Sequence, residues 1–275
     1  MDRRAFVATT ATVCAGAWRP TSHARRHIER VGLQLYTVRH ELEHDFEGTL
    51  ARVATTGYRE VEFAGYFGRT PKDVRALCDH HGLAAPSAHV SVDTLAPDAW
   101  HAALEAANAI GHHYLVVAWI PVEQRRTLDD YKRVGERFNQ AAATAHAAGI
   151  QLAYHNHDFE FAPVDGQLPY DVLLAATDPK LVQLEIDLYW MVKGGQDPTH
   201  YFERWPGRVP LVHVKDSAGP PDNRMTAVGK GTIDFRRIFA HPAARIEHYF
   251  VEHDQPADAF ASIRESYDYL KQLDF

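Results

Sequence analysis

Short apolar runs alternate with longer amphipathic stretches eight times from residue 31 to the C-terminus. The apolar runs have the length and composition of buried parallel strands. We expect strands at Val31–Tyr36, Tyr58–Phe63, Ala85–Val90, Tyr114–Trp119, Gln151–His155, Val182–Asp187, Val209–Val214 and Tyr249–Glu252. The stretches between them have the apolar spacing of helices, and the clearest example is 130–148.

Glycines mark the ends of three expected helices. Gly57, Gly82 and Gly149 each stand just before an expected strand, which is where a helix-terminating glycine belongs in a repeated β/α unit. Eight such units in about 245 residues predict an α/β fold, a single (β/α)8 TIM barrel. An open doubly wound sheet would need a glycine-rich turn after its first strand, and the segment 36–40 contains no glycine. We therefore expect one domain over residues 31–275.

Residues 1–30 have the pattern of an export signal followed by a short linker. Arg3 and Arg4 precede a weakly apolar run, and Ala15-Gly16-Ala17 has the small residues of a cleavage site. The run is too short to span a membrane. We expect export by the twin-arginine route to the periplasm, cleavage near Ala17 and no insertion into the membrane.

The formal net charge is -7. Nucleic acids and anionic membrane surfaces attract positively charged proteins, so this charge disfavours both as partners. A homo-oligomer is compatible with the sequence, and no sequence feature identifies an interface.

Polar and aromatic residues gather at the ends of the expected strands, where barrels of this kind have their active sites. Because side chains alternate along a strand, Glu185 and Asp187 face the barrel interior if Leu184 and Ile186 face the helices. The strand-end residues are Gln34, Tyr36, Glu62, His89, Trp119, His155, His157, Asp187, His213, Lys215 and Glu252. Burying so many polar groups without partners would be costly, so they predict a functional pocket.

Four strand ends together predict a site for one divalent metal ion. They contribute two imidazoles and two carboxylates, from His155, Asp187, His213 and Glu252. Such a mixed set suits Mn, Co, Zn, Fe or Mg and does not select among them. The expected role of the ion is to hold a substrate oxygen and stabilise an enediolate while a neighbouring proton leaves.

Seven motifs resemble the sugar phosphate isomerase/epimerase family, a barrel superfamily shared with xylose isomerase and the apurinic endonucleases. They are the segments 32–36, 57–62, 154–160, 186–190, 213–216, 229–235 and 250–252. The resemblance implies a metal held by Glu, Asp, His and Glu after strands five to eight. Asp187, His213 and Glu252 occupy the last three places, but His155 stands where the family has Glu. Either His155 or Glu160, in the loop that follows, is then the fourth ligand.

The departure at His155 bears on the reaction. Family epimerases use two glutamates as an acid/base pair on opposite faces of a sugar, and an imidazole breaks that symmetry. The resemblance implies a sugar isomerase or epimerase acting on a small keto-sugar. The alternative is a lyase or dehydratase that dehydrates an inosose or cleaves a 3-keto-glycoside. Export favours this alternative, because phosphorylated sugars are scarce outside the cytoplasm.

We expect Glu252 to be the catalytic base, with His155 or His157 as its acid/base partner, because imidazole titrates near neutral pH. The expected substrate-binding residues are Gln34, Tyr36, Glu62, His89, Trp119, Glu160, Trp190 and Lys215.

Two other classes of function are alternatives. A trinuclear-zinc apurinic endonuclease needs an Asp-x-His pair shortly after residue 217, but residues 222–225 contain no His, and Trp190 stands where a further zinc ligand belongs. A non-catalytic sugar-binding barrel is the other alternative. The Gly229-Lys-Gly231 turn lacks phosphate-loop spacing and is expected to shape the return to the next helix. The segment 216–222 has the length of a lid beside the pocket.

Overall fold

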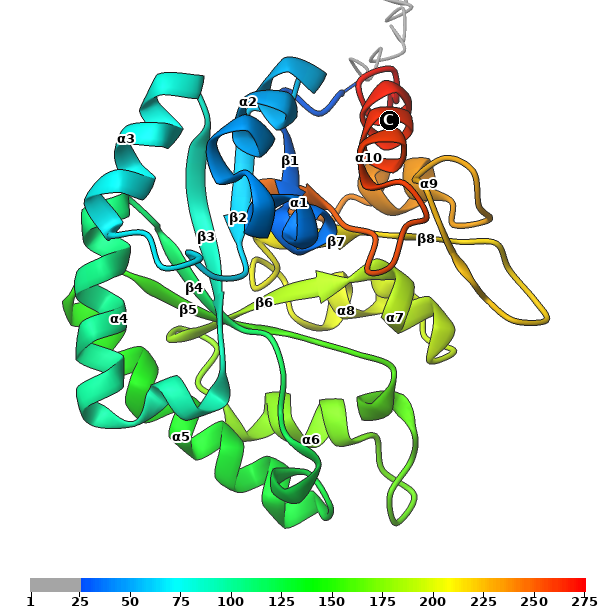
Figure 1. Cartoon of the computed structure of the whole chain (residues 1–275). Helices are drawn as coiled ribbons and strands as arrows, with labels where there is room; N and C mark the ends of the chain where they lie inside the picture. Colours follow the sequence, from blue (N-terminus) through cyan, green and yellow to red (C-terminus); the bar gives the residue numbers. More distant parts are fainter. Residues whose placement is uncertain (1–25) are drawn as a thin grey trace, which may run out of the picture.

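Eight parallel strands close into a barrel in the computed structural model, which describes residues 26–275 (Figure 1). The order around the barrel is β1-β10-β7-β6-β5-β4-β3-β2. The strands are β1 Val31–Gln34, β2 Glu60–Phe63, β3 Ala84–Val90, β4 Tyr114–Val117, β5 Gln151–His155, β6 Val182–Asp187, β7 Leu211–Val214 and β10 His248–Val251. The prediction of a single TIM barrel is confirmed. The proposed export signal lies outside the described residues.

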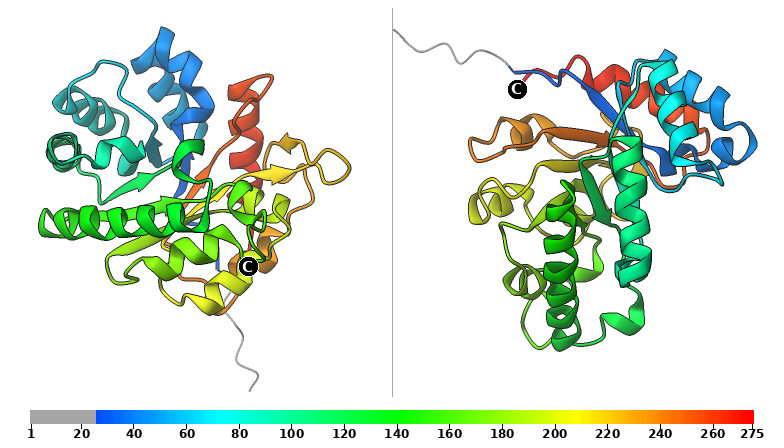
Figure 2. Two further views of the ribbon diagram at one scale, coloured as in Figure 1. Left: turned by 90° about the horizontal axis from the view of Figure 1, so that it is seen from below. Right: turned by 90° about the vertical axis from the view of Figure 1, so that its left-hand side faces the viewer.

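Helices cover the outside of the barrel (Figures 1 and 2). They are α1 Arg39–His44, α2 Phe46–Thr56, α3 Pro71–His81, α4 Pro97–Ile110, α5 Leu128–Ala147, α6 Pro169–Ala176, α7 Leu188–Lys193, α8 Pro198–Arg204, α9 Phe235–Ala240 and α10 Ala259–Leu270. The expected helix over 130–148 is α5, which begins at a capping box made by Thr127 and Asp130. It closes beside Gly149, whose φ of 77° is the left-handed conformation that glycine adopts readily.

All eight expected strands are present, with small differences at their ends. The first strand stops at Gln34 rather than Tyr36, because the Gln34 side chain accepts a hydrogen bond of 3.0 Å from the Tyr36 amide. This bond turns the chain into a 3₁₀ helix over Leu35–Val38. As a result, Tyr36 leaves the barrel wall and lies at its rim, 41% exposed.

The barrel interior is apolar at its floor and polar towards the carboxyl ends of the strands. The floor is the buried cluster Val116, Ala153, Leu211 and Phe250. Gly32 makes room for it, because a Cβ there would lie 2.5 Å from the Phe250 ring. Alternation along β5, β7 and β10 then brings the next inward positions, His155, His213 and Glu252, above this floor. The polar groups are thus collected at one end of the barrel.

A two-stranded hairpin follows β7, formed by β8 Asp216–Ser217 and β9 Met225–Thr226. Its base is closed by the Asp216 carboxylate, which accepts hydrogen bonds from the amides of Gly229 (2.9 Å), Gly231 (2.9 Å) and Ile233 (3.2 Å). These amides hold a carboxylate of the chain itself, in agreement with the rejection of a phosphate loop. The Tyr189 hydroxyl of α7 donates to the Asn223 carbonyl at 2.7 Å and ties down the hairpin tip.

The two ends of the described chain lie together (Figure 2). Arg26 and Phe275 exchange two backbone hydrogen bonds of 2.7 and 2.8 Å. Within residues 26–275, none of the helices is both long and apolar enough to cross a membrane.

Candidate functional site

A cavity of about 620 Å³ opens at the carboxyl ends of the strands. Its lining residues are Tyr36, Ala64, His89, Val90, Ser91, Ala118, Trp119, His155, His157, Asp158, Phe159, Trp190, Lys215, Glu252 and Asp254. The volume is in the range of pockets that enclose a small molecule. Aromatic rings form part of its wall, and the Trp119 ring meets His157 and Phe159 edge-on at centroid distances of 4.8 and 5.0 Å. The cavity therefore offers flat apolar surfaces beside a polar floor.

One cluster of the polar floor surrounds the Glu185 carboxylate, and we call it the lower group. Glu185 Oε2 lies 2.9 Å from His89 Nε2, 3.2 Å from His213 Nε2 and 3.4 Å from His155 Nδ1. All four side chains offer a ligand atom within 4.8 Å of the others. Glu62 borders this group, with Oε1 at 2.6 Å from His213 Nε2. Three imidazoles from β3, β5 and β7 thus converge on a carboxylate from β6.

A second cluster, the upper group, contains Asp187, His213 and Glu252. His213 belongs to both groups because its Nδ1 faces Glu252 Oε2 at 2.7 Å while its Nε2 faces Glu185. The Lys215 ammonium lies among the upper carboxylates, 3.1 Å from Asp187 Oδ2 and 2.7 Å from Glu252 Oε2. It also lies 2.8 Å from Asp254 Oδ1. The upper group is thus already bound to a cationic side chain.

Burial and neighbouring charges shift the pKa values of the groups around the cavity. Burial opposes ionisation of Glu252, but the Lys215 ammonium and the His213 imidazole outweigh it and hold the pKa of Glu252 well below its usual range. Burial lowers the pKa of both His155 and His157 well below the usual imidazole value, and neighbouring positive groups add to this effect. Both rings are therefore neutral at neutral pH. Burial raises the pKa of Asp187 to about 6, against the opposing charge of Lys215.

Glu160 does not reach the cavity, contrary to its expected role as substrate contact or alternative metal ligand. Its carboxyl group is hydrogen-bonded to the Tyr154 hydroxyl and accepts a hydrogen bond of 2.7 Å from the His157 amide. Neighbouring side chains on β5 point to opposite sides of the barrel wall, so Tyr154 points outward where His155 points inward. The hydrogen bond to Tyr154 therefore keeps the Glu160 side chain on the outer side. Of the two residues weighed as fourth ligand, only His155 faces the site.

Gln34 and Glu62 lie beneath the cavity rather than in its lining. The Gln34 amide donates to Glu62 Oε1 at 2.7 Å, and Ser87 donates to the other Glu62 oxygen. Both are fully buried, so their position fits support of His213 and His89 better than contact with substrate. The other expected substrate-binding residues, Tyr36, His89, Trp119, Trp190 and Lys215, all line the cavity.

Two residues of the site were not among those expected. Alternation along β6 placed Glu185 inside the barrel, but the family motif drew attention only to Asp187. Asp254 lies two residues beyond Glu252 and lines the cavity beside Lys215. The same alternation that brought in Glu252 would have indicated Asp254, had the pattern been continued past the end of the strand.

The floor of the cavity fits a divalent cation. Among the described residues, His155 Nδ1 and Glu185 Oε1 are buried and have no hydrogen-bond partner, and buried Asp187 Oδ2 has no hydrogen bond but lies 3.1 Å from the Lys215 ammonium. Native proteins rarely leave buried polar atoms unpaired. Imidazole and carboxylate donors with free lone pairs are ligands for a transition metal, and a bound ion would satisfy these atoms.

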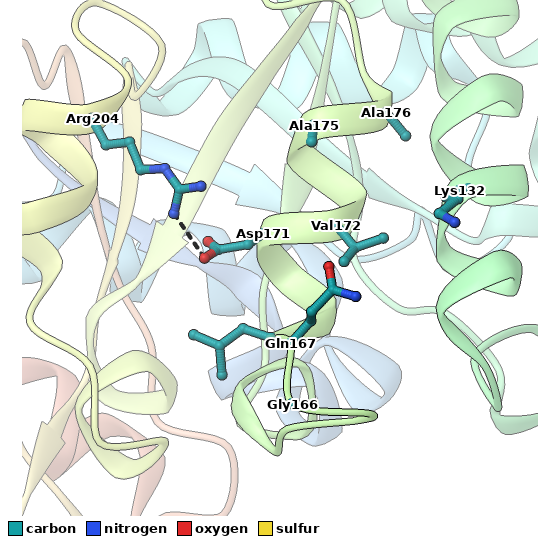
Figure 3. Close-up of a pocket in the computed structure, with 9 residues that line it drawn as sticks. Lys132, Gly166, Gln167, Asp171, Val172, Ala175, Ala176 and Arg204 are labelled. Atoms are coloured by element: carbon teal, nitrogen blue, oxygen red, sulfur yellow. Dashed lines mark hydrogen bonds and ion pairs between the residues drawn. The ribbon is translucent and has the colours of Figure 1, made fainter.

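A second hollow lies on the outer surface along α5 and α6 (Figure 3). Asp171 and Arg204 form an ion pair of 2.7 Å at one side of it, and Lys132 of α5 borders the other. The residues that line it are Lys132, Gly166, Gln167, Leu168, Asp171, Val172, Ala175, Ala176 and Arg204. They include no histidine and no paired carboxylates, so the hollow lacks the acid/base groups present at the barrel mouth.

Comparison with known proteins agrees with the TIM barrel fold. The family model described as xylose isomerase-like TIM barrel matches residues 50–273. The chain is 25% identical to an inosose dehydratase of Lacticaseibacillus casei over 236 residues, which cover 72% of this chain and 77% of that protein. It is 25% identical over 228 residues to an inosose dehydratase of Geobacillus kaustophilus, covering 70% and 73%. A solved sugar phosphate isomerase/epimerase of Parabacteroides distasonis has 30% identity and a TM-score of 0.78, with 89% of this chain and 98% of that one covered.

Proposed function

The chain belongs to the xylose isomerase-like TIM barrel family, and from this premise we propose that it is a metal-dependent enzyme acting on a small polyhydroxylated keto-compound. The reaction begins with removal of a proton next to the carbonyl. We propose further that elimination follows, so that the enzyme is a lyase or dehydratase. Dehydration of a keto-inositol and cleavage of a 3-keto-glycoside are both reactions of this kind.

The unequal character of the acid/base groups is the observation that carries this proposal. An epimerase removes a proton from one face and returns it to the other, which calls for two comparable bases. Here the Glu252 carboxylate is held by His213 and Lys215, each at 2.7 Å, and is a weak base. His157 lines the cavity as a neutral imidazole whose Nδ1 has no partner among residues 26–275. An elimination needs one base to remove a proton and one cation to stabilise the leaving oxygen. The neutral His157 imidazole and the Lys215 ammonium can fill these two roles.

The steps follow from these two groups. The His157 imidazole accepts the proton beside the carbonyl, and the electron pair of the broken C–H bond forms a carbon–carbon double bond. The bond to the β-oxygen breaks, the Lys215 ammonium stabilises the charge that develops on this oxygen, and the oxygen takes its proton from solvent. Asp187, Glu252 and Asp254 hold that ammonium in place. This assigns the role of base to His157 and a supporting role to Glu252.

A divalent ion bound at the cavity floor would polarise the substrate carbonyl and so favour proton loss. Its ligands would come from the upper and lower groups: His89, His155, Glu185, Asp187, His213 and Glu252. The residues of the chain do the rest. Tyr36, Trp119 and Trp190 supply flat walls that can pack against a sugar ring and exclude water.

The test is incubation of the mature protein with a 3-keto-glucoside and with 2-keto-myo-inositol in deuterated water, followed by NMR. Elimination products would support the proposal. Deuterium uptake at the α-carbon with inversion and without elimination would instead favour an epimerase, as the name of the Parabacteroides relative suggests. Binding without any exchange would favour a non-catalytic sugar-binding barrel.

A matched pair of variants tests the assigned base. His157→Gln should lower the elimination rate by about 10²-fold or more, the size expected for loss of a general base. His146→Gln removes an exposed histidine from the surface of α5 and should leave the rate unchanged. Equal rates in both variants would remove His157 from the mechanism.

We also propose that the protein is exported by the twin-arginine route, on the pattern of residues 3–17. A fusion of residues 1–30 to a reporter that is active only in the periplasm should give signal. Replacing Arg3 and Arg4 by lysine should abolish it. Signal that persists in the lysine variant would argue against this route.

A further inference from the structure

We propose that the lower group is a metal site, in which three imidazoles and one carboxylate bind a divalent transition-metal ion below the upper group. The ligand atoms are His89 Nε2, His155 Nδ1, His213 Nε2 and an oxygen of Glu185. This inference rests on the proposed function and deepens it, because it changes which residues hold the ion. The family resemblance implies the upper carboxylates Asp187 and Glu252 instead.

The spacing of the lower group carries the proposal. A tetrahedral ion with bonds of about 2.0–2.1 Å separates its ligands by roughly 3.3 Å. Glu185 Oε2 lies 2.9, 3.2 and 3.4 Å from the three imidazole nitrogens. The ring centroids of His155 and His213 are 4.4 Å apart, and those of His89 and His213 are 5.1 Å apart. The three rings thus each present a nitrogen to the Glu185 carboxylate.

Two atoms of the lower group have nothing else to bind. His155 Nδ1 and Glu185 Oε1 are buried and lack a hydrogen-bond partner among the described residues. The side chains of His155 and Glu185 are 3% and 0% exposed, so solvent does not supply one. Unpaired polar atoms in a protein interior are costly. An ion coordinated by His155 Nδ1 and by Glu185 Oε1 would pair both atoms and remove this cost.

The partners of His213 favour the lower position over the upper one. Its Nδ1 lies 2.7 Å from Glu252 Oε2, and its Nε2 lies between Glu62 Oε1 at 2.6 Å and Glu185 Oε2 at 3.2 Å. Glu252 can therefore accept the proton of Nδ1 while Nε2 binds an ion in the lower group. Donation of the distant ring N–H to a carboxylate is the usual arrangement behind a metal-bound histidine. In this arrangement Glu252 orients the ligand rather than acting as one.

The upper group is less well suited to an ion. The Lys215 ammonium already lies between Asp187 and Glu252, at 3.1 and 2.7 Å. Asp187 Oδ2 is 3.8 Å from His155 Nε2 and 3.9 Å from His213 Nδ1, wider than the roughly 3.3 Å edge of a tetrahedral site. His155 therefore lies closer to the ligands of the lower group than to those of the upper group.

The donor set also indicates the kind of ion. Three imidazoles select Zn, Fe, Co or Ni over Mg, which prefers oxygen ligands. Glu62 Oε1 lies 3.2 Å from His89 Nε2 and adds a second negative charge beside the group. Because His89 and His155 also line the cavity, an ion in the lower group would lie at the floor of the cavity, within reach of a substrate.

The test measures Co²⁺ binding to the full mature chain by competition with a chelator, in the wild type and three variants. Glu185→Gln should weaken binding at least 100-fold, while Asp187→Asn should change it less than threefold. Glu60→Gln is the matched control, because Glu60 also bonds a histidine inside the barrel, His248 Nδ1 at 2.8 Å, but at the opposite end. It should bind Co²⁺ like the wild type.

If Glu185→Gln fails to fold, His89→Gln takes its place, because His89 lies at the cavity wall and the same 100-fold loss is expected. The anomalous signal of Co²⁺ in crystals gives a direct position, expected within about 2.2 Å of His89, His155 and His213 nitrogens. Loss of binding in Asp187→Asn with wild-type binding in Glu185→Gln would overturn the inference and leave the proposed function intact. A wild type that eliminates its substrate but binds no ion would also overturn it.

Discussion

The buried Glu160 carboxyl makes a strong prediction about how stability depends on pH. Burial raises the pKa of Glu160 to about 8 from an unperturbed 4.5. Between these two values the folded chain keeps a proton that the unfolded chain has lost. The free energy of unfolding contributed by this group therefore falls as pH rises from 4.5 to 8, by about 1.4 kcal/mol per pH unit.

Glu160→Gln removes this dependence while keeping the contacts. The glutamine carbonyl can accept from the His157 amide, and its amide can donate to the Tyr154 hydroxyl. The stability of the variant relative to wild type should therefore increase by about 2.7 kcal/mol between pH 5.5 and pH 7.5. Urea denaturation at a series of pH values measures this difference directly.

The control is Glu136→Gln, which removes a carboxylate from the exposed surface of α5. Its stability relative to wild type should not change with pH over the same interval. A Glu160→Gln curve that runs parallel to wild type from pH 5.5 to 7.5 would refute the reasoning, because Glu160 would then be ionised in the folded chain.

Three further predictions concern the site and the hairpin. Lys215→Met leaves the Asp187, Glu252 and Asp254 carboxylates without their cation, so it should destabilise the fold by about 3–5 kcal/mol in denaturation and abolish elimination; a stable, active variant would contradict the assigned role. Trp119→Ala, at a side chain 44% exposed, should raise KM about tenfold with an unchanged melting temperature; an unchanged KM would remove Trp119 from the substrate wall. Gly231→Ala would place a Cβ 2.2 Å from the Ser217 carbonyl oxygen, so calorimetry should show a loss of about 1–3 kcal/mol; wild-type stability would mean that the hairpin base can shift.

The fold could be predicted from the sequence because strand length, helix spacing and helix-ending glycines all pointed to the same repeat. Gly57, Gly82 and Gly149 stand at helix ends with positive φ, as the repeat requires. The strand ends were less predictable. Nothing in the apolar pattern indicates that the Gln34 side chain turns the backbone at Tyr36, because that is a single side-chain hydrogen bond.

The site could be predicted only for residues within the strands, where side chains alternate between the inside and the outside of the barrel. This alternation placed Asp187, His213 and Lys215 inside the barrel, where they meet. It could not tell that His155 lies nearer to Glu185 than to Glu252, because that depends on the barrel register and on rotamers. Glu160 was misplaced for a similar reason, since a loop has no fixed alternation and the Tyr154 hydroxyl holds the carboxylate on the outer side.

The closed base of the hairpin has a consequence for how such an enzyme can change. The Asp216 carboxylate fastens the chain directly after Lys215 to the amides of Gly229, Gly231 and Ile233. Because of these bonds, a change within residues 217–228 is not expected to move β7, which carries His213 and is followed by Lys215. Insertions, deletions or grafted loops in this stretch should leave the catalytic strand in place. The hairpin is thus a region whose length and sequence can vary without displacing the residues that follow β7.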